Sequence, residues 1–370
     1  VTRSRLPGWL SRIPARVMWA ASRPYIICFA LTALIVSRWF DAGTFIASGD
    51  MGPFIRSGWA PEASWTWNHS TTGAGSAAYN VGRGFEFILI DAVKALGGNE
   101  YIAQWLFYIC IYGFVSVSVA YCVRFFVRNE FAVILGGMFA VLNGFFLTRL
   151  PNPLNIISVA TIALLTGLAL RVAAGRPISP VWGGFALLPI SFLAFNPPMM
   201  LVAFAWAVGG TSLVVLLVLG RSALWRLLKW FIPLAPWAIL LNAWWLVPVA
   251  WSFLGGGGAA TNASFQDPSN WAWSQAQNQI PNILTLVANW AWVKPQYLPF
   301  AASMDEPWII WVRYLIPALV FAAPLLARLA LRRSALALLA VSLPFVFLAK
   351  GLQPVWAPIN LWMYNNVPMF

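Results

Sequence analysis

The chain has 370 residues and a formal net charge of +13, yet 61% of its residues are hydrophobic and only 9% are charged. Water-soluble globular domains carry about 25% charged residues, so this composition excludes a soluble fold. Binding of nucleic acid is also not expected, because the basic residues form neither one patch nor a soluble aromatic motif.

Apolar blocks recur along the whole chain, and each is roughly 16–23 residues long, the length at which a helix crosses about 30 Å of hydrocarbon. We therefore predict an all-α integral membrane protein with about nine transmembrane helices. The expected spans are 24–40, 101–122, 131–148, 154–172, 181–196, 199–220, 230–252, 308–328 and 335–349.

The basic residues predict the orientation of these spans. Residues 1–23 form a basic N-terminal segment ahead of a polytopic membrane domain, 24–349, and the absence of a small-residue cleavage site indicates that the first span stays as an anchor. By the positive-inside rule this segment lies in the cytoplasm, which places the C-terminal segment 350–370 outside. The cytoplasmic side also receives the other loop cations: Arg124, Arg128, Arg171, Arg176, Arg221, Arg226, Lys229, Arg328, Arg332 and Arg333.

Two long outer loops, 41–100 and 253–307, carry most of the acidic residues, and only Glu130 falls in a cytoplasmic loop. Long loops on one face indicate that the chemistry lies there. In the first loop an apolar stripe at helical spacing predicts an interfacial helix on the membrane surface. The stripe is Phe85, Ile88, Leu89, Ala92, Val93 and Leu96, with Glu86, Asp91 and Lys94 on another face and Gly97-Gly98 at the end.

The sequence contains no motif of the familiar soluble enzymes. Cys28, Cys110 and Cys122 lack the spacing of a zinc site and are interpreted as small buried residues. Few charges lie within the apolar blocks, which disfavours an ion-coupled transporter. A polar, Trp-rich outer face with carboxylates near the membrane favours transfer of a sugar from a polyprenyl phosphate to an external acceptor.

Asp50 is the candidate general base, because it follows the first span in a turn that contains Gly49, Gly52 and Pro53. The alternative is that it caps the next helix. Asp41, directly after the first span, is a second candidate carboxylate or a cation ligand, with pairing to Arg38 as its alternative. The sequence leaves the metal unknown, and a divalent cation remains open.

The candidates for binding the donor phosphate are Arg56, Arg83 and Arg313. Arg313 falls about five residues inside a predicted span, where a guanidinium needs an anion or must extend toward the interface. For the sugar or the acceptor, the patch of Trp67, Asn68 and His69 offers aromatic faces and polar groups.

Several of these residues follow one another in a recognisable order. A basic N terminus and one span precede Gly49-Asp50 and Pro53, then Trp67-Asn68 followed by Gly73 and Gly75, and then the helix that ends at Leu96-Gly97-Gly98. This order resembles the first loop of membrane-embedded GT-C glycosyltransferases. Within that class it is similar to the N-terminal membrane part of the large cell-wall α-(1→3)-arabinofuranosyltransferases and related large bacterial membrane proteins.

The resemblance implies a GT-C-like fold in the bacterial plasma membrane, with an outer cavity and a first-loop carboxylate at Asp50 as base or ligand. It implies arabinofuranose on a polyprenyl-phosphate donor and a cell-envelope glycan as the acceptor. The sequence departs from it in lacking paired acidic residues in this loop. Members of the family extend beyond this length, so we interpret the chain as a truncated or split gene product that needs a partner chain for the missing domains.

Two other functional classes stay open on the sequence. A lipid-linked glycan flippase or transporter would need a continuous hydrophilic cavity with charged residues facing it. A non-catalytic membrane assembly subunit would have no need of Asp50.

Overall fold

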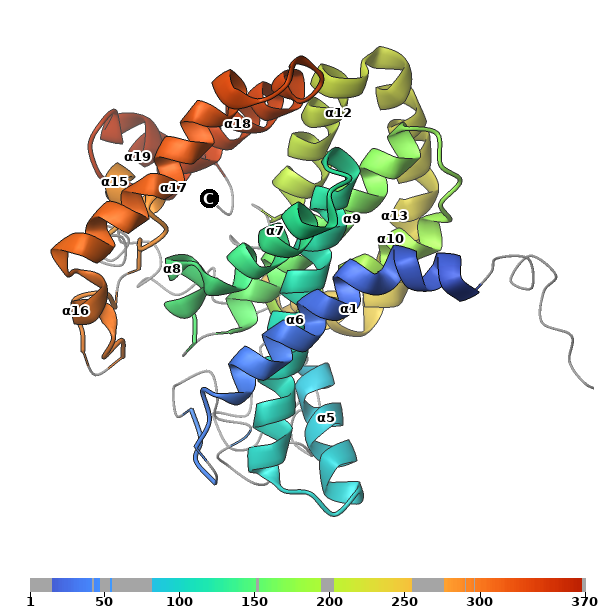
Figure 1. The fold of residues 1–370 in the computed structure, drawn as a ribbon. Helices are drawn as coiled ribbons and strands as arrows, with labels where there is room; N and C mark the ends of the chain where they lie inside the picture. The colour runs from blue at the N-terminus through green and yellow to red at the C-terminus, as the bar shows by residue number, and fades with distance from the viewer. Residues whose placement is uncertain are drawn as a thin grey trace, which may run out of the picture.

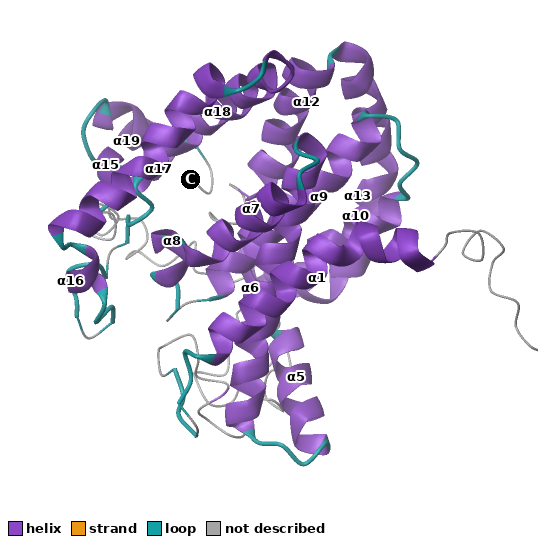
Figure 2. Cartoon of the chain, in the orientation of Figure 1, coloured by secondary structure: helices purple, strands orange, loops and turns teal. Residues whose placement is uncertain are grey.

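The computed structural model describes residues 15–41, 43–46, 54, 82–150, 153–193, 203–254, 276–289, 291–295 and 297–367, and regular structure in these ranges is helical (Figure 2). The elements follow the labels of Figure 1. They are α1 (Ala15–Ser37), α5 (Gly84–Ala95), α6 (Glu100–Phe126), α7 (Glu130–Leu142), α8 (Gly144–Leu147), α9 (Leu154–Ala173), α10 (Pro180–Leu187), η3 (Leu188–Leu193), η4 (Ala205–Gly210), α12 (Thr211–Leu219), α13 (Arg221–Leu254), α15 (Ile280–Leu284), α16 (Ala301–Met304), α17 (Pro307–Leu326), α18 (Leu329–Ala349) and α19 (Ala357–Asn366).

Within the described residues, six helices are long and apolar enough to cross a membrane: Glu100–Phe126, Glu130–Leu147, Asn155–Ala173, Arg221–Pro248, Pro307–Leu326 and Leu331–Ala349. They confirm a multi-pass, all-α membrane protein. Shorter apolar helical segments at 21–37, 180–193 and 205–219 coincide with the three remaining expected spans. A total of nine crossings stays a prediction.

Two of the shorter segments are not regular α-helices throughout. After α10 the chain tightens into the 3-10 helix η3, which contains Pro189, a residue that lacks the backbone N–H of a regular helix. Before α12 the chain forms the π-helical turn η4, a wider winding that usually interrupts a longer helix.

The seventh expected span begins earlier than the sequence suggested. We placed Arg221, Arg226 and Lys229 in a loop before residue 230, but α13 already begins at Arg221 and runs for 34 residues. A helix of that length is about 51 Å long, well beyond the roughly 30 Å of a hydrocarbon core. The basic residues therefore occupy helical turns that extend past the span.

Helix α6 lies at the centre of the first packing unit, with α1, α7 and α9 beside it and α5 along its first half (Figure 1). A Cβ built on Gly137 of α7 would lie 2.8 Å from the Ser116 carbonyl oxygen of α6 and 2.9 Å from Sγ of Cys28 in α1. Glycine is therefore required where the three helices meet. Cys28 is buried as expected, whereas Cys110 is exposed, which corrects that part of the prediction.

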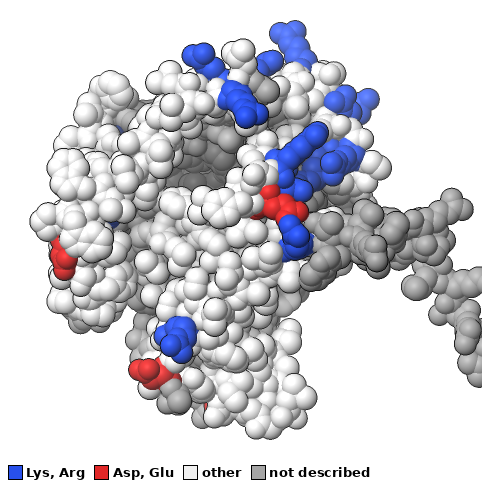
Figure 3. Space-filling model, viewed as in Figure 1, with Lys and Arg blue, Asp and Glu red and all other residues white. Residues whose placement is uncertain are grey.

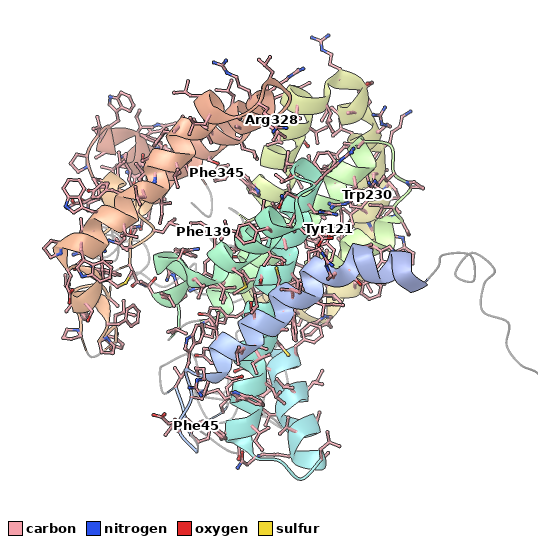
Figure 4. The ribbon with its side chains drawn as sticks, viewed as in Figure 1. Phe45, Tyr121, Phe139, Trp230, Arg328 and Phe345 are labelled. Atoms are coloured by element: carbon pink, nitrogen blue, oxygen red, sulfur yellow. The ribbon has the colours of Figure 1, made fainter. Side chains whose placement is uncertain are left out.

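A second packing unit joins α9 to α10, α12 and α13. At its edge the buried Arg171 guanidinium lies 3.7 Å from the centre of the Tyr121 ring and donates to the carbonyls of Gly167 and Tyr121. Nearby, the Trp230 indole donates to the Ile178 carbonyl. Figure 4 shows Tyr121 and Trp230 in this region.

Helices α17 and α18 form an antiparallel pair, here called the arm, which Figure 1 shows extending away from the α6 unit. Helix α18 packs on α12, and near the end of α18 the ring of Phe345 lies 4.9 Å from the Trp206 ring of η4. The loop before the arm is attached to the α6 unit, because the Asn289 amide donates to the Thr148 carbonyl. The arm is thus held near both of its ends.

Figure 3 shows Lys and Arg side chains gathered over one end of the molecule. We call it the basic end, and its exposed cations are Arg23, Arg128, Arg176, Arg221, Arg226, Lys229, Arg328, Arg332 and Arg333. Glu130 also lies at this end and forms an ion pair with Arg23. The clustering agrees with the loops chosen from the sequence, and the compartment that the basic end faces stays a prediction.

Candidate functional site

Five of the predicted site residues lie outside the described residues: Asp50, Arg56, Trp67, Asn68 and His69. Their roles stay predictions. Asp41, Arg83 and Arg313 are described, and all three lie away from the basic end, in or next to the two long loops.

The helix expected in the first loop is α5, which ends two residues before Gly97, where φ is +82°. Phe87, Ile90 and Val93 are buried on the side that faces α6. Phe85, Ile88 and Leu96 stay exposed, as an interfacial stripe requires. The structure pairs α5 with α6 in a hairpin (Figure 1), and its contact with a membrane surface stays a prediction.

Glu86 is fully buried rather than on an exposed polar face, and its partner is Arg83. Nε of Arg83 donates to one carboxylate oxygen of Glu86 at 2.6 Å, and Nη2 donates to the other at 2.6 Å. The side chains are 1% and 0% exposed. Two parallel charge-assisted bonds of this kind fix the guanidinium in position and balance its charge.

Aromatic side chains from distant parts of the chain surround the start of α5. A Cβ on Gly84 would lie 3.0 Å from the Trp244 ring of α13, so the backbone and the indole are in contact. Phe85 meets Trp244 edge to face at 5.7 Å and Phe192 of η3 at 6.3 Å. The ion pair therefore lies where α5, α13 and η3 converge.

Another face of α5 borders an apolar groove of about 380 Å³. It runs between α5, α6, α9, α10 and η3, and its lining is almost entirely hydrocarbon and aromatic surface. Residues that define it include Phe85, Leu89, Phe107, Cys110, Phe185 and Phe192. Such a groove on a membrane-spanning bundle suits a hydrocarbon chain.

Asp41 follows Phe40, whose ring packs edge to face on Tyr108 at 5.4 Å. The Asp41 side chain is exposed, and the backbone N–H and hydroxyl of Thr44 donate to its carbonyl oxygen in a turn. The pairing with Arg38 considered above is not present between these two described residues. Asp41 is thus a solvent-accessible carboxylate just past the end of α1.

Arg313 forms an ion pair within the chain. Nη1 donates to Asp305 at 3.1 Å, and the other Asp305 oxygen accepts from the Trp292 indole at 2.7 Å. The guanidinium also lies 5.6 Å from the centre of the Trp292 ring. Asp305, just before α17, therefore pairs with a cation that was a candidate for the donor phosphate, while Nε of Arg313 is buried without a hydrogen-bond partner among the described residues.

The structure does not bring the described candidates together. Arg83 belongs to the α5 region and Arg313 to the arm, and Figure 1 shows these parts well separated. Sequence reasoning missed Glu86 as the partner of Arg83, although a separation of three residues on a helix signals such a pair. It also missed Trp244 and the groove, which depend on contacts between distant segments.

Among the described residues, no group of three or more His, Cys, Asp or Glu side chains is arranged to hold a metal ion. No protein-family model matches the chain, and neither a curated protein nor a solved structure shows significant similarity to it. The functional assignment therefore depends on the site itself.

Proposed function

We propose that the chain is a membrane glycosyltransferase that moves a sugar from a polyprenyl-phosphate donor to a cell-envelope glycan on the side away from the basic end. In this proposal the protein lies in a bacterial plasma membrane with the basic end in the cytoplasm. Arabinofuranose is the sugar implied by the resemblance described above.

One juxtaposition carries the proposal: the apolar groove and the buried Arg83–Glu86 pair share the first two turns of α5. Phe85 and Leu89 line the groove, while Arg83 and Glu86 lie on the adjoining face of the same helix. The groove suits the apolar chain of a lipid-linked donor, whereas Arg83 is buried and paired with Glu86, so it would have to exchange this partner to bind the donor phosphate. An apolar groove without a charged group on the same helix would not support this function.

The reaction requires a base, and Asp50 is our candidate. Its carboxylate would take the proton of the acceptor hydroxyl as that oxygen bonds to the anomeric carbon. The bond between the anomeric carbon and the phosphate oxygen would break, and its electron pair would leave with the polyprenyl phosphate. The product would carry the inverted configuration at the anomeric carbon.

The proposal is tested by supplying radiolabelled polyprenyl-phosphate sugars to the purified protein, and to membranes that contain it, because the resemblance implies a partner chain. Asp50→Asn should reduce transfer by at least a hundredfold, in the range seen for loss of a general base. Undiminished transfer by this variant would refute the assignment of the base.

The groove has its own test in Cys110→Trp, which places an indole among the lining residues. We expect the KM for the donor to rise, whereas Cys110→Ser should leave it unchanged. Leu34→Trp places the same indole on the exposed face of α1, where Leu34 is 63% exposed, and serves as the control. An equal effect of both tryptophans would show that the groove does not hold the donor chain.

A further inference from the structure

We propose that the basic end is a binding surface for anionic phospholipids, with two adjoining rows of cations that contact the lipid phosphates. One row is Arg328 and Arg332 on the arm, and the other is Arg221 and Lys229 on α13. This inference depends on the membrane assignment and is independent of the proposed glycosyl transfer.

The row on the arm lies at the turn between α17 and α18, where Figure 4 labels Arg328. Arg328 immediately precedes α18 and Arg332 lies one turn further on, so both can reach toward the same side. Both side chains are exposed. Beside them are three leucines that are among the most exposed apolar residues of the described chain: Leu325 at 75%, Leu326 at 76% and Leu329 at 85%.

The row on α13 repeats this combination of cations and apolar surface. Arg221, Trp225 and Lys229 are spaced four residues apart, which places them on one face of the helix. Arg221 and Lys229 are exposed, and the Trp225 indole between them is 64% exposed. Tryptophan with flanking cations is typical of the boundary between acyl chains and head groups.

A contact within the protein joins the two rows. The Arg333 guanidinium of α18 donates to the Leu217 carbonyl in the last turn of α12. Gly220, with φ of +87°, then turns the chain directly into Arg221 at the start of α13. The arm row and the α13 row therefore lie near one another, and Figure 3 shows separate groups of Lys and Arg over this end, with uncharged surface between them.

Among the described residues, these four cations have no acidic partner. The acidic residue at this end, Glu130, is occupied by Arg23. The positive-inside rule explains on which side the cations lie, but not why exposed leucines and a tryptophan accompany them. A lipid satisfies both, because its phosphate meets the cations while its acyl chains cover the apolar side chains.

The experiment measures lipid selectivity of the whole chain in phosphatidylcholine bilayers by electron spin resonance, with spin-labelled phosphatidylglycerol or phosphatidylcholine as probe. One cation near the surface contributes about 1 kcal/mol, so we expect a roughly fivefold preference for phosphatidylglycerol. The double variants Arg328→Gln/Arg332→Gln and Arg221→Gln/Lys229→Gln should each lower the preference, and the fourfold variant should abolish it. In 1 M NaCl, where the Debye length is about 3 Å, the wild-type preference should largely disappear.

The matched control is Arg38→Gln/Lys94→Gln, which removes two cations away from the basic end and should leave the preference intact. A preference that survives the fourfold variant, or that the control lowers equally, would overturn the proposal. All substituted cations of the basic end are exposed, and circular dichroism with a monodisperse elution profile verifies that each variant is folded. A preference that persists in 1 M NaCl would also contradict it.

Discussion

Glu86→Gln should be among the most destabilising single substitutions in the first outer loop. The variant keeps the shape of the side chain but removes the charge that neutralises Arg83, whose guanidinium is 1% exposed. Loss of one partner from a buried ion pair costs about 3–5 kcal/mol, because the other charge stays buried and loses that partner's compensation. Arg83→Gln should have an effect of the same size.

The double variant Arg83→Gln/Glu86→Gln separates this mechanism from a simple loss of packing. With both charges removed, no uncompensated charge remains, so the double variant should be less destabilised than the sum of the two single variants. The same helix provides a control in Lys94→Gln. Lys94 and Glu100 also form an ion pair, at 2.7 Å, but their side chains are 41% and 26% exposed, and exposed pairs contribute about 0–1 kcal/mol.

The assay is reversible unfolding of the purified protein in mixed micelles with increasing denaturing detergent, followed by circular dichroism. The reasoning predicts a loss of several kcal/mol for each single variant of the buried pair, and less than about 1 kcal/mol for Lys94→Gln. Equal losses at Glu86 and Lys94, or strictly additive effects in the double variant, would show that Arg83 does not depend on Glu86 for compensation.

Two further predictions concern the helix packing. Gly137→Ala should lower the stability by about 1–3 kcal/mol, because the new methyl group would lie within 3 Å of both Ser116 and Cys28. The control is Gly209→Ala, where a Cβ meets nothing within 4 Å. Equal thermal stability of the two variants would contradict the close contact. The midpoint of thermal denaturation should be well below that of Arg176→Gln in the variant Arg171→Gln, since Arg171 is buried against Tyr121 whereas Arg176 is exposed. The prediction fails if both variants denature at the wild-type temperature.

The sequence alone determined the class of the protein. Apolar blocks of membrane-spanning length are a local property of the chain, and the expected spans coincide with six long apolar helices and three shorter ones. The helix between Arg83 and Gly97 was also predictable, since the helical spacing of its apolar residues and its terminal glycines are local signals. Clustering of the loop cations at one end followed from the alternation of spans and loops.

The tertiary structure decided what the individual polar residues do. Nothing near Glu86 in the sequence shows that water is excluded from it, so its burial became apparent only when the helices were assembled. Arg313 needed an anion on chemical grounds, but only the fold selects Asp305 and supports it with Trp292. Cys110 lies in an apolar block like Cys28, yet one lines a groove and the other a helix contact. Hydrophobicity fixes which segments enter the membrane, whereas the faces that they turn to one another depend on packing among segments far apart in the chain.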